Sequence, residues 1–109
     1  MERRITTLKT FDEVFRRGRN VFCGSVQVRI LPAASEELRW GVAVSAKKWK
    51  RAVDRNRIKR VLREAVRPLL GHFRNGGQVV FLFLGDNPGI SPETLREDIE
   101  QGLRKANIL

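Results

Sequence analysis

The sequence predicts a single α+β domain in which helices pack on one small sheet. Three observations lead to this expectation. The first half of the chain alternates apolar and polar residues as strands do. The middle and the end have the apolar spacing of helices, and no linker, repeat or low-complexity tract divides the 109 residues. With 41% hydrophobic residues, the chain can form one core. The expected order of elements is α-β-β-α-β-α, with room for one further short strand.

A first short helix is expected over residues 11–17. Its apolar side chains have the i, i+3, i+4 spacing of one helical face, at Phe11, Val14 and Phe15. Thr10 and Glu13 have the spacing of a capping box at the start of this helix. Gly18 can close its end.

Two strands should follow this helix, over residues 21–31 and 38–46, with a turn region over residues 32–37. Alternation gives the first strand one face with Phe22, Val26, Val28 and Ile30, and another with Ser25, Gln27 and Arg29. The second strand alternates Leu38, Trp40, Val42 and Val44 with Arg39, Gly41, Ala43 and Ser45. The small residues of this last set leave room for another group to approach the sheet.

A long helix, a buried strand and a last helix complete the domain. The helix is expected over residues 54–70, and Gly76-Gly77 is expected to form a turn. Residues 78–84 are apolar almost throughout, which indicates a central strand buried on both faces. After a loop, Ser91 is a suitable N-cap for the last helix, with Pro92 in its first position. The apolar side of that helix consists of Leu95, Ile99, Leu103 and Ala106.

The chain is strongly basic. It has 22 Lys and Arg residues against 12 Asp and Glu, a formal charge of +10 and a pI near 11.2. Such a charge favours a polyanionic partner. The longest apolar run, residues 79–84, is too short to span a bilayer, and the basic helix lacks the aromatic anchors of a membrane-surface helix. We therefore expect a nucleic-acid partner and no membrane.

Cysteine usage and the N-terminal segment indicate a cytoplasmic location. Cys23 is the only cysteine, so no internal disulfide can form, and no Cys/His spacing suits zinc. We expect Cys23 to be an edge or core thiol. Residues 1–11 are basic, but no apolar segment follows them, so we expect no signal peptide.

The most informative segment is residues 47–67, which holds ten of the 22 basic residues and only two acids. On a helix, one arc carries the apolar residues that should face the core, namely Ile58, Val61, Leu62, Ala65 and Val66. The opposite arc carries Asn56, Lys59, Arg60, Arg63 and Arg67. Arginine forks suit phosphate oxygens, and an asparagine amide can both donate and accept hydrogen bonds.

An ordinary solvated helix face is the alternative interpretation of these charges. They are nearly all of one sign, however. Glu64 can pair along the helix with Arg60 and Arg67, whereas Lys59 and Arg63 have no local partner. Like charges at i, i+4 destabilise a helix by roughly a few tenths of a kcal/mol each. The pattern therefore favours a polyanion that neutralises these cations.

At this helix the chain resembles the protein of bacterial ribonuclease P. The resemblance rests on the run Arg55-Asn56-Arg57-Ile58-Lys59-Arg60, followed by Arg63-Glu64. The preceding residues 40–48 and 50–53 are also similar. Further matches are Leu8, Phe11, Val14, Phe15 and Gly18 near the N-terminus, and Leu103, Lys105 and Ala106 near the C-terminus. The resemblance covers nearly the whole chain. It departs at Arg29, where family members often carry an aromatic residue, and the stretch after Ser45 differs by a residue from some members.

The resemblance implies an α/β sandwich with a mixed sheet and a left-handed βαβ crossover, like the second domain of a small-subunit ribosomal protein. It implies a subunit of a ribonucleoprotein endonuclease that removes the 5′ leader of precursor tRNA. Catalysis would reside in the RNA, which needs Mg²⁺, and the protein alone would bind no metal or cofactor and cleave nothing. The implied partners are ribonuclease P RNA and precursor tRNA, and not DNA.

Two sets of site residues follow from the basic segment and from the resemblance. Residues expected to bind the catalytic RNA are Lys47, Lys48, Lys50, Arg51, Arg55, Asn56, Arg57, Lys59, Arg60, Arg63 and Arg67. A cleft between the first helix and the sheet is expected to hold the leader, with Phe11, Phe15, Gln27 and Arg29.

We expect no catalytic site within the polypeptide. His72 is the only histidine and follows the basic helix, where it should cap carbonyls or face solvent, and the acids are scattered. Two other functions stay open at this point. One is a ribosomal-type RNA-binding protein or RNA chaperone with no role in an enzyme. The other is a DNA-binding regulator, which is disfavoured because no helix-turn-helix, zipper or dimer signal is present.

Overall fold

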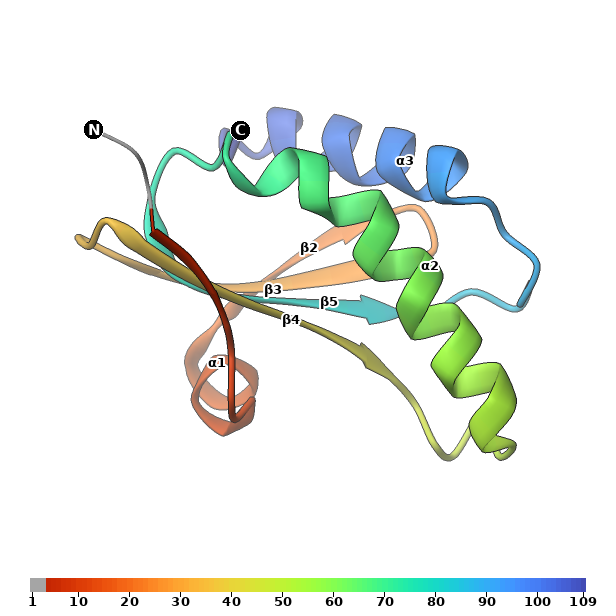
Figure 1. The fold of residues 1–109 in the computed structure, drawn as a ribbon. Helices are drawn as coiled ribbons and strands as arrows, with labels where there is room; N and C mark the ends of the chain where they lie inside the picture. Colours follow the sequence, from red (N-terminus) through yellow and green to blue (C-terminus); the bar gives the residue numbers. More distant parts are fainter. Residues whose placement is uncertain (1–3) are drawn as a thin grey trace.

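The computed structural model describes residues 4–109 and confirms one small α+β domain. Three helices pack on a five-stranded sheet, with α2 and α3 on one face and α1 on the other (Figure 1). The elements are β1 (Arg4–Thr7), α1 (Asp12–Arg17), β2 (Arg19–Cys23), β3 (Val26–Ala33), β4 (Glu37–Val44), α2 (Ala52–Leu70), β5 (Gly76–Phe83) and α3 (Pro92–Lys105). The expected order lacked two strands, because it did not include β1 and joined β2 and β3 into one strand.

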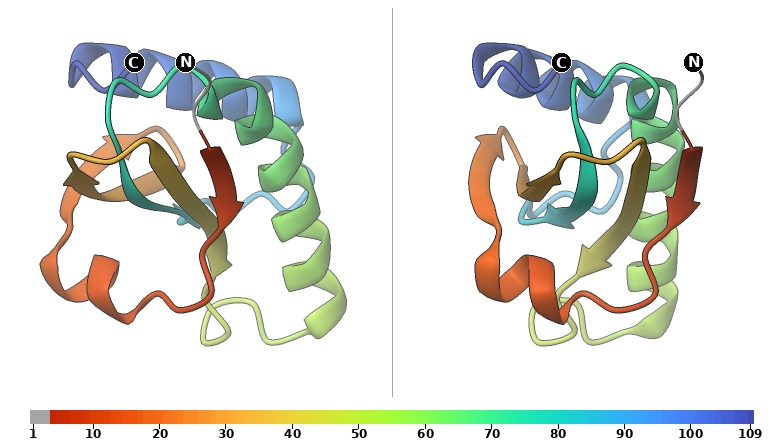
Figure 2. Two further views of the ribbon diagram at one scale, coloured as in Figure 1. Left: turned by 60° about the vertical axis from the view of Figure 1, so that its left-hand side comes forward. Right: turned by 90° about the vertical axis from the view of Figure 1, so that its left-hand side faces the viewer.

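The sheet is mixed and has the strand order β1-β4-β5-β3-β2. β1 and β5 both run parallel to β4, whereas β3 is antiparallel to β5 and β2 is antiparallel to β3. From β4 the chain passes through α2, which lies over the sheet, and enters β5 on the far side of β4 (Figures 1 and 2). This path makes the βαβ crossover left-handed, which is rare. The crossover implied by the resemblance is therefore present.

The strand expected over residues 21–31 is instead a hairpin. β2 and β3 are joined at Gly24-Ser25, where Gly24 has φ +63°, a left-handed conformation that glycine adopts without strain. The turn pairs Cys23 with Val26, so that both side chains point into the core. Phe22, which we expected on the core face, is instead 68% exposed on the opposite face.

Gly76 and Gly77 lie in a strand, and not in the expected turn. They begin β5 at a point where the neighbouring backbones come very close. A Cβ atom at Gly76 would collide with the carbonyl oxygen of Ser35, and one at Gly77 with that of Leu31. Gly77 also has φ +120°, which disfavours other residues. The two glycines are therefore required by close strand packing.

The two predicted helix starts have different outcomes. Ser91 caps α3 as expected, because its Oγ accepts a hydrogen bond from the Thr94 amide at 3.2 Å. The expected capping box of α1 is wrong. The N-cap is Phe11, without a side-chain hydrogen bond, and Glu13 instead accepts a hydrogen bond from the Gln78 side chain of β5 at 2.6 Å. Glu13 thus ties α1 to the sheet.

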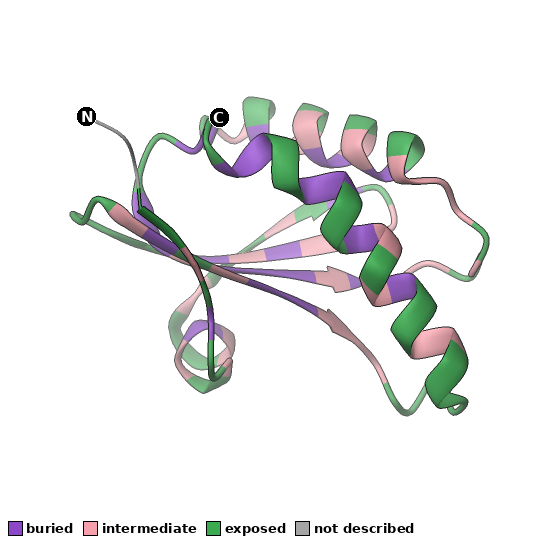
Figure 3. Ribbon diagram, viewed as in Figure 1, coloured by how far each residue is buried: buried purple, intermediate pink, exposed green. Residues whose placement is uncertain are grey.

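The main core lies between the sheet and the two helices α2 and α3 (Figure 3). β5 is the central strand and is buried on both faces, as expected. Phe81 and Phe83 point into the main core, and Val80 points to the other face. There Val80 packs with Leu8 and Val14 in a smaller cluster under α1. α1 is thus held by few contacts and covers only part of its face.

A contact between α3 and α2 compensates for Pro68, which lies inside α2. Proline has no amide hydrogen, so the carbonyl of Glu64 lacks its usual helical donor. Arg96 of α3 donates from Nη2 to this oxygen at 3.1 Å and from Nε to the Ala65 oxygen at 3.0 Å. This double contact fixes α2 against α3. Within residues 4–109, no helix has the length and apolar character needed to cross a membrane.

Candidate nucleic-acid interface

The helix α2 has two distinct faces. As expected, Ile58, Leu62, Ala65 and Val66 are buried in the main core, and Val61 is half-buried beside them. Asn56, Arg60, Arg63 and Arg67 are exposed, and Lys59 is half-buried. The apolar arc buries one side of the helix, so the opposite arc must face outward. We call the five outward residues Asn56, Lys59, Arg60, Arg63 and Arg67 the α2 ridge.

No carboxylate within residues 4–109 pairs with a cation of the α2 ridge. Among the residues that the structure describes, no basic side chain of α2 makes an ion pair, and Glu64 does not pair with Arg60 or Arg67. In the preceding loop, Lys48 pairs with Asp86 at 2.6 Å in an exposed position. The ridge therefore presents positive charge that no described carboxylate neutralises.

Arg55 differs from the other basic residues of the expected RNA-binding set. Its Nη1 donates to the carbonyl oxygens of Trp49 at 2.7 Å and Lys50 at 2.9 Å. These hydrogen bonds tie the first turn of α2 to the loop before it. Arg55 thus holds the backbone that carries Lys50 and Arg51, both of which are exposed.

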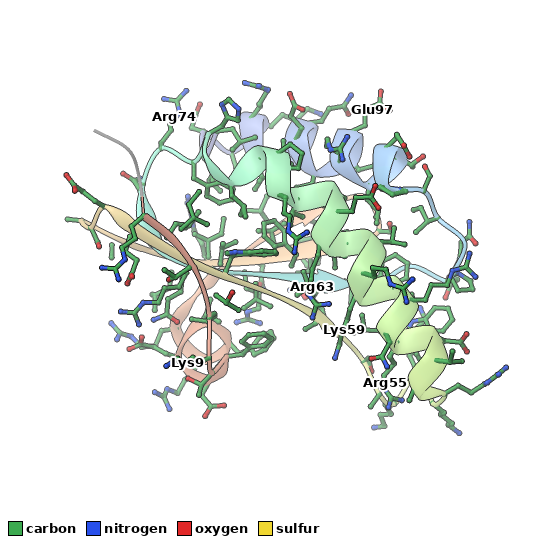
Figure 4. The ribbon with its side chains drawn as sticks, in the orientation of Figure 1. Lys9, Arg55, Lys59, Arg63, Arg74 and Glu97 are labelled. Atoms are coloured by element: carbon green, nitrogen blue, oxygen red, sulfur yellow. The ribbon has the colours of Figure 1, made fainter. Side chains whose placement is uncertain are left out.

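A groove of about 340 Å³ runs between α2, β4 and the segment that leads into α1. Lys59, Arg63 and Arg67 line one side of it, and Phe11 and Trp40 line the other with Thr7, Leu8, Gly41 and Val42. In Figure 4, Lys59 and Arg63 project from the side of α2 that faces β4. The groove thus joins a residue expected to contact the leader with residues expected to contact the catalytic RNA. Sequence reasoning missed Thr7 because it did not include β1, and it assigned Trp40 to the apolar face of the strand now seen as β4, but to no site.

Phe11 and Phe15 form an edge-to-face pair on the inner side of α1, with ring centroids 6.0 Å apart. Both rings are half-buried and pack against the small cluster under α1. Gly41 leaves space for Phe11, since a Cβ atom there would lie 2.6 Å from the ring. The space that Gly41 leaves on β4 is therefore partly filled by the ring of Phe11, the N-cap of α1.

Arg29 of β3 is anchored beneath α1. Its guanidinium carbon lies 5.5 Å from the centre of the Phe15 ring, and its Nη2 donates to the Phe15 carbonyl oxygen. Gln27, two residues earlier on the same strand face, is half-buried. Three of the four expected leader residues, Phe11, Phe15 and Arg29, are thus in one connected cluster, and Gln27 lies beside it.

A second groove, of about 560 Å³, lies on the other side of α1. It contains Arg4 and Arg39, but Glu37 pairs with both, at 3.7 Å and 2.8 Å. The hydrogen bond from Arg39 lowers the pKa of the Glu37 carboxyl. Since its arginines are already paired, this groove is a weaker candidate for a polyanion than the groove at α2.

The remaining reactive side chains do not gather into a site. His72 is exposed, and Cys23 is buried, which raises the pKa of its thiol to about 11. A thiol with so high a pKa is a poor nucleophile at neutral pH. Cys23 lies on the edge strand β2 with its side chain in the core, as the expectation of an edge or core thiol allowed. Within the described part of the chain, no three His, Cys, Asp or Glu side chains are grouped as they would be around a metal ion.

Comparisons with known proteins agree on one family. The family model described as Ribonuclease P matches residues 1–107. A "Ribonuclease P protein component" from Caldanaerobacter subterraneus is 35% identical over 96% of this chain and 92% of the relative. Another, from a Synechococcus species, is 34% identical over 90% of this chain and 87% of the relative.

Solved structures have the same fold. The RNase P protein from Thermotoga maritima superposes with a TM-score of 0.73 at 23% identity, over 89% of this chain and 91% of the other. The Staphylococcus aureus RNase P protein superposes with a TM-score of 0.69 at 21% identity, over 94% of this chain and 95% of the other. Together with the family match, these findings show that the chain belongs to the ribonuclease P protein family, the protein components of a ribonucleoprotein endonuclease of tRNA processing.

Proposed function

We propose that this protein binds the catalytic RNA of ribonuclease P through the α2 ridge and holds the 5′ leader of precursor tRNA beside α1. In this proposal the RNA carries the Mg²⁺ ions and performs the cleavage. The observation that carries the proposal is the groove in which unpaired cations of α2 face Phe11. One continuous surface can thus contact two RNA segments at once.

The α2 ridge is suited to a folded RNA. Arginine forks bind phosphate oxygens in two-point contacts, and Asn56 can reach a sugar or a base edge. The helix is held at both ends, by Arg55 at its start and by Arg96 near its end. A fixed row of cations loses little conformational entropy when it meets a fixed row of phosphates.

The α1 side is suited to a single strand. Phe11 and Phe15 are half-buried, so each ring keeps some surface on which a base could stack. Arg29 holds the Phe15 ring from below, and Lys59 and Arg63 lie across the groove from Phe11. Stacking depends little on base identity, which suits an enzyme that acts on many precursors.

The proposed role predicts that the protein activates the RNA at low magnesium. Purified ribonuclease P RNA should cleave precursor tRNA with the protein at Mg²⁺ concentrations at which the RNA alone is inactive, because the cations of α2 replace metal ions in screening phosphate charge. The measurement is the rate of leader release by gel electrophoresis. The protein without RNA serves as the control and should release nothing. Equal rates with and without the protein would support the alternative of an RNA chaperone with no role in the enzyme.

The leader contact predicts a selective loss in one variant. Phe15→Leu keeps an apolar side chain in the cluster under α1 but removes the ring. It should weaken binding of the assembled holoenzyme to precursor tRNA by about tenfold, since a base stacked on an aromatic ring contributes roughly 1–3 kcal/mol. Binding to mature tRNA should be unchanged. Titrations with both tRNAs measure this difference. Equal weakening of binding to both tRNAs would show that Phe15 does not contact the leader.

A further inference from the structure

An uncovered row of side chains crosses the sheet on the α1 face. Strand register places Phe22 of β2 opposite Gln27 of β3, Gln27 opposite Leu82 of β5, and Leu82 opposite Ala43 of β4. α1 packs near the next row, which contains Arg29, Val80 and Gly41. The two rows are about 7 Å apart, two residues along a strand. In Figure 1, α1 lies under one end of the sheet, and no helix lies under the end with the arrowheads of β4 and β5.

This row is unusually apolar for an open surface. Phe22 is 68% exposed, and Leu84, which follows β5 on the same face, is 43% exposed. They are two of only four large hydrophobic side chains that are exposed within residues 4–109. Leu82 and Gln27 between them are half-buried. We call Phe22, Gln27, Leu82 and Leu84 the β2 shelf.

The β2 shelf is continuous with the proposed leader site. Ala43, at one end of the row, packs against the cluster that contains Phe11 and Phe15. At the other end, Phe22 lies on the edge strand of the sheet, where the row ends. A strand of RNA that leaves the two phenylalanines across the sheet would therefore next meet Gln27 and Leu82, and then Phe22.

The charges around the β2 shelf favour an anionic occupant. Lys48 donates to the carbonyl oxygen of Leu84 at 3.1 Å, which places its ammonium group at the border of the shelf. Arg29 lies in the adjoining row, on the same face of the sheet. Asp86 pairs with Lys48 at this border, at 2.6 Å, and offsets part of its charge. An exposed aromatic ring with cations at the border of its surface is suited to single-stranded nucleic acid.

We propose that Phe22 stacks on a base of the leader that is farther from the tRNA body than the nucleotides beside Phe11 and Phe15. This inference rests on the proposed function, because it needs the leader to lie on the α1 face. Gln27 can hydrogen-bond a base or sugar on the way, and Lys48 can contact a phosphate. The β2 shelf thus adds a second stacking site that only long leaders reach.

The test combines Phe22→Ala with leaders shortened one nucleotide at a time. For long leaders, the variant should weaken holoenzyme binding to precursor tRNA by about tenfold. For leaders too short to reach the β2 shelf, the variant and the wild type should bind equally. The variant Phe22→Trp should bind long-leader precursors as tightly as the wild type does, because indole also stacks on bases. Ile5→Ala is the matched control: Ile5 is 40% exposed on the opposite edge strand, and its truncation should change nothing.

The decisive experiment uses a leader with an abasic site at the nucleotide that reaches the β2 shelf, so that no base can stack on Phe22. The abasic site should weaken wild-type binding as much as Phe22→Ala does, and the two changes together should cost no more than either alone. Equal binding of Phe22→Ala and wild type at every leader length would overturn this inference. If Phe15→Leu still weakened binding of precursor tRNA alone, the proposed function would stand. If the wild-type holoenzyme bound precursor and mature tRNA equally well, the proposed leader site itself would be contradicted.

Discussion

Raising the salt concentration from 50 to 200 mM is expected to weaken binding of the protein to ribonuclease P RNA by about a thousandfold. Each phosphate that a cation neutralises releases counterions, and about six such phosphates produce a change of this size. The ridge and the loop before it supply enough cations, because no basic side chain of α2 is paired within the described residues and Lys50 and Arg51 are exposed.

A salt titration of the dissociation constant measures this effect. The double variant Arg60→Ala and Arg63→Ala should bind more weakly at low salt, and its slope should be smaller by about one unit for each phosphate that is no longer neutralised. Arg104→Ala, on α3, is the matched control, because Arg104 already pairs with Glu100 at 3.0 Å. A nearly flat salt dependence would contradict an electrostatic interface.

The substitution Ile58→Asp is expected to unfold the domain. Ile58 is 1% exposed and packs in the main core, so a carboxylate there would be buried without a partner. An unpaired buried charge costs several kcal/mol, which is comparable with the roughly 5–15 kcal/mol by which domains are stable. Circular dichroism and urea denaturation should show loss of the cooperative transition.

Arg63→Ala is the matched substitution on the opposite face of α2. Arg63 is exposed and unpaired, so the free energy of unfolding should change by no more than about 0.5 kcal/mol, while affinity for the RNA falls. The opposite pattern, a destabilised Arg63→Ala that still binds RNA normally, would mean that the two faces of α2 are exchanged.

Local patterns were sufficient for the helices and for the central strand. The arcs of α2, the Ser91 cap and the double-sided burial of β5 were all predicted correctly. Each depends on side-chain periodicity or on one capping residue, which neighbouring residues determine. The hairpin turn at Gly24-Ser25 also has a sequence signal, since Gly-Ser between two apolar runs is a common turn. The unbroken alternation on either side of it favoured one long strand instead.

Other features depended on partners that are distant in sequence. β1 is four residues long, and only its pairing with β4 makes it a strand. Glu13 bonds to Gln78 in place of a capping box because the sheet brings a side-chain amide within reach. The glycines of β5 are needed because two neighbouring backbones approach them, and nothing in their own segment indicates this.

The sequence by itself determined that the chain has one basic amphipathic helix with an outward row of cations, because helical periodicity and charge are local properties. Only the tertiary structure decided what that row faces. The left-handed crossover sets α2 beside the open end of β4, which brings Lys59 and Arg63 across a groove from Phe11. The hairpin likewise reversed Phe22 from the core to the surface. Burial of an apolar side chain depends on which face of the sheet the helices cover, and that choice is made by long-range packing.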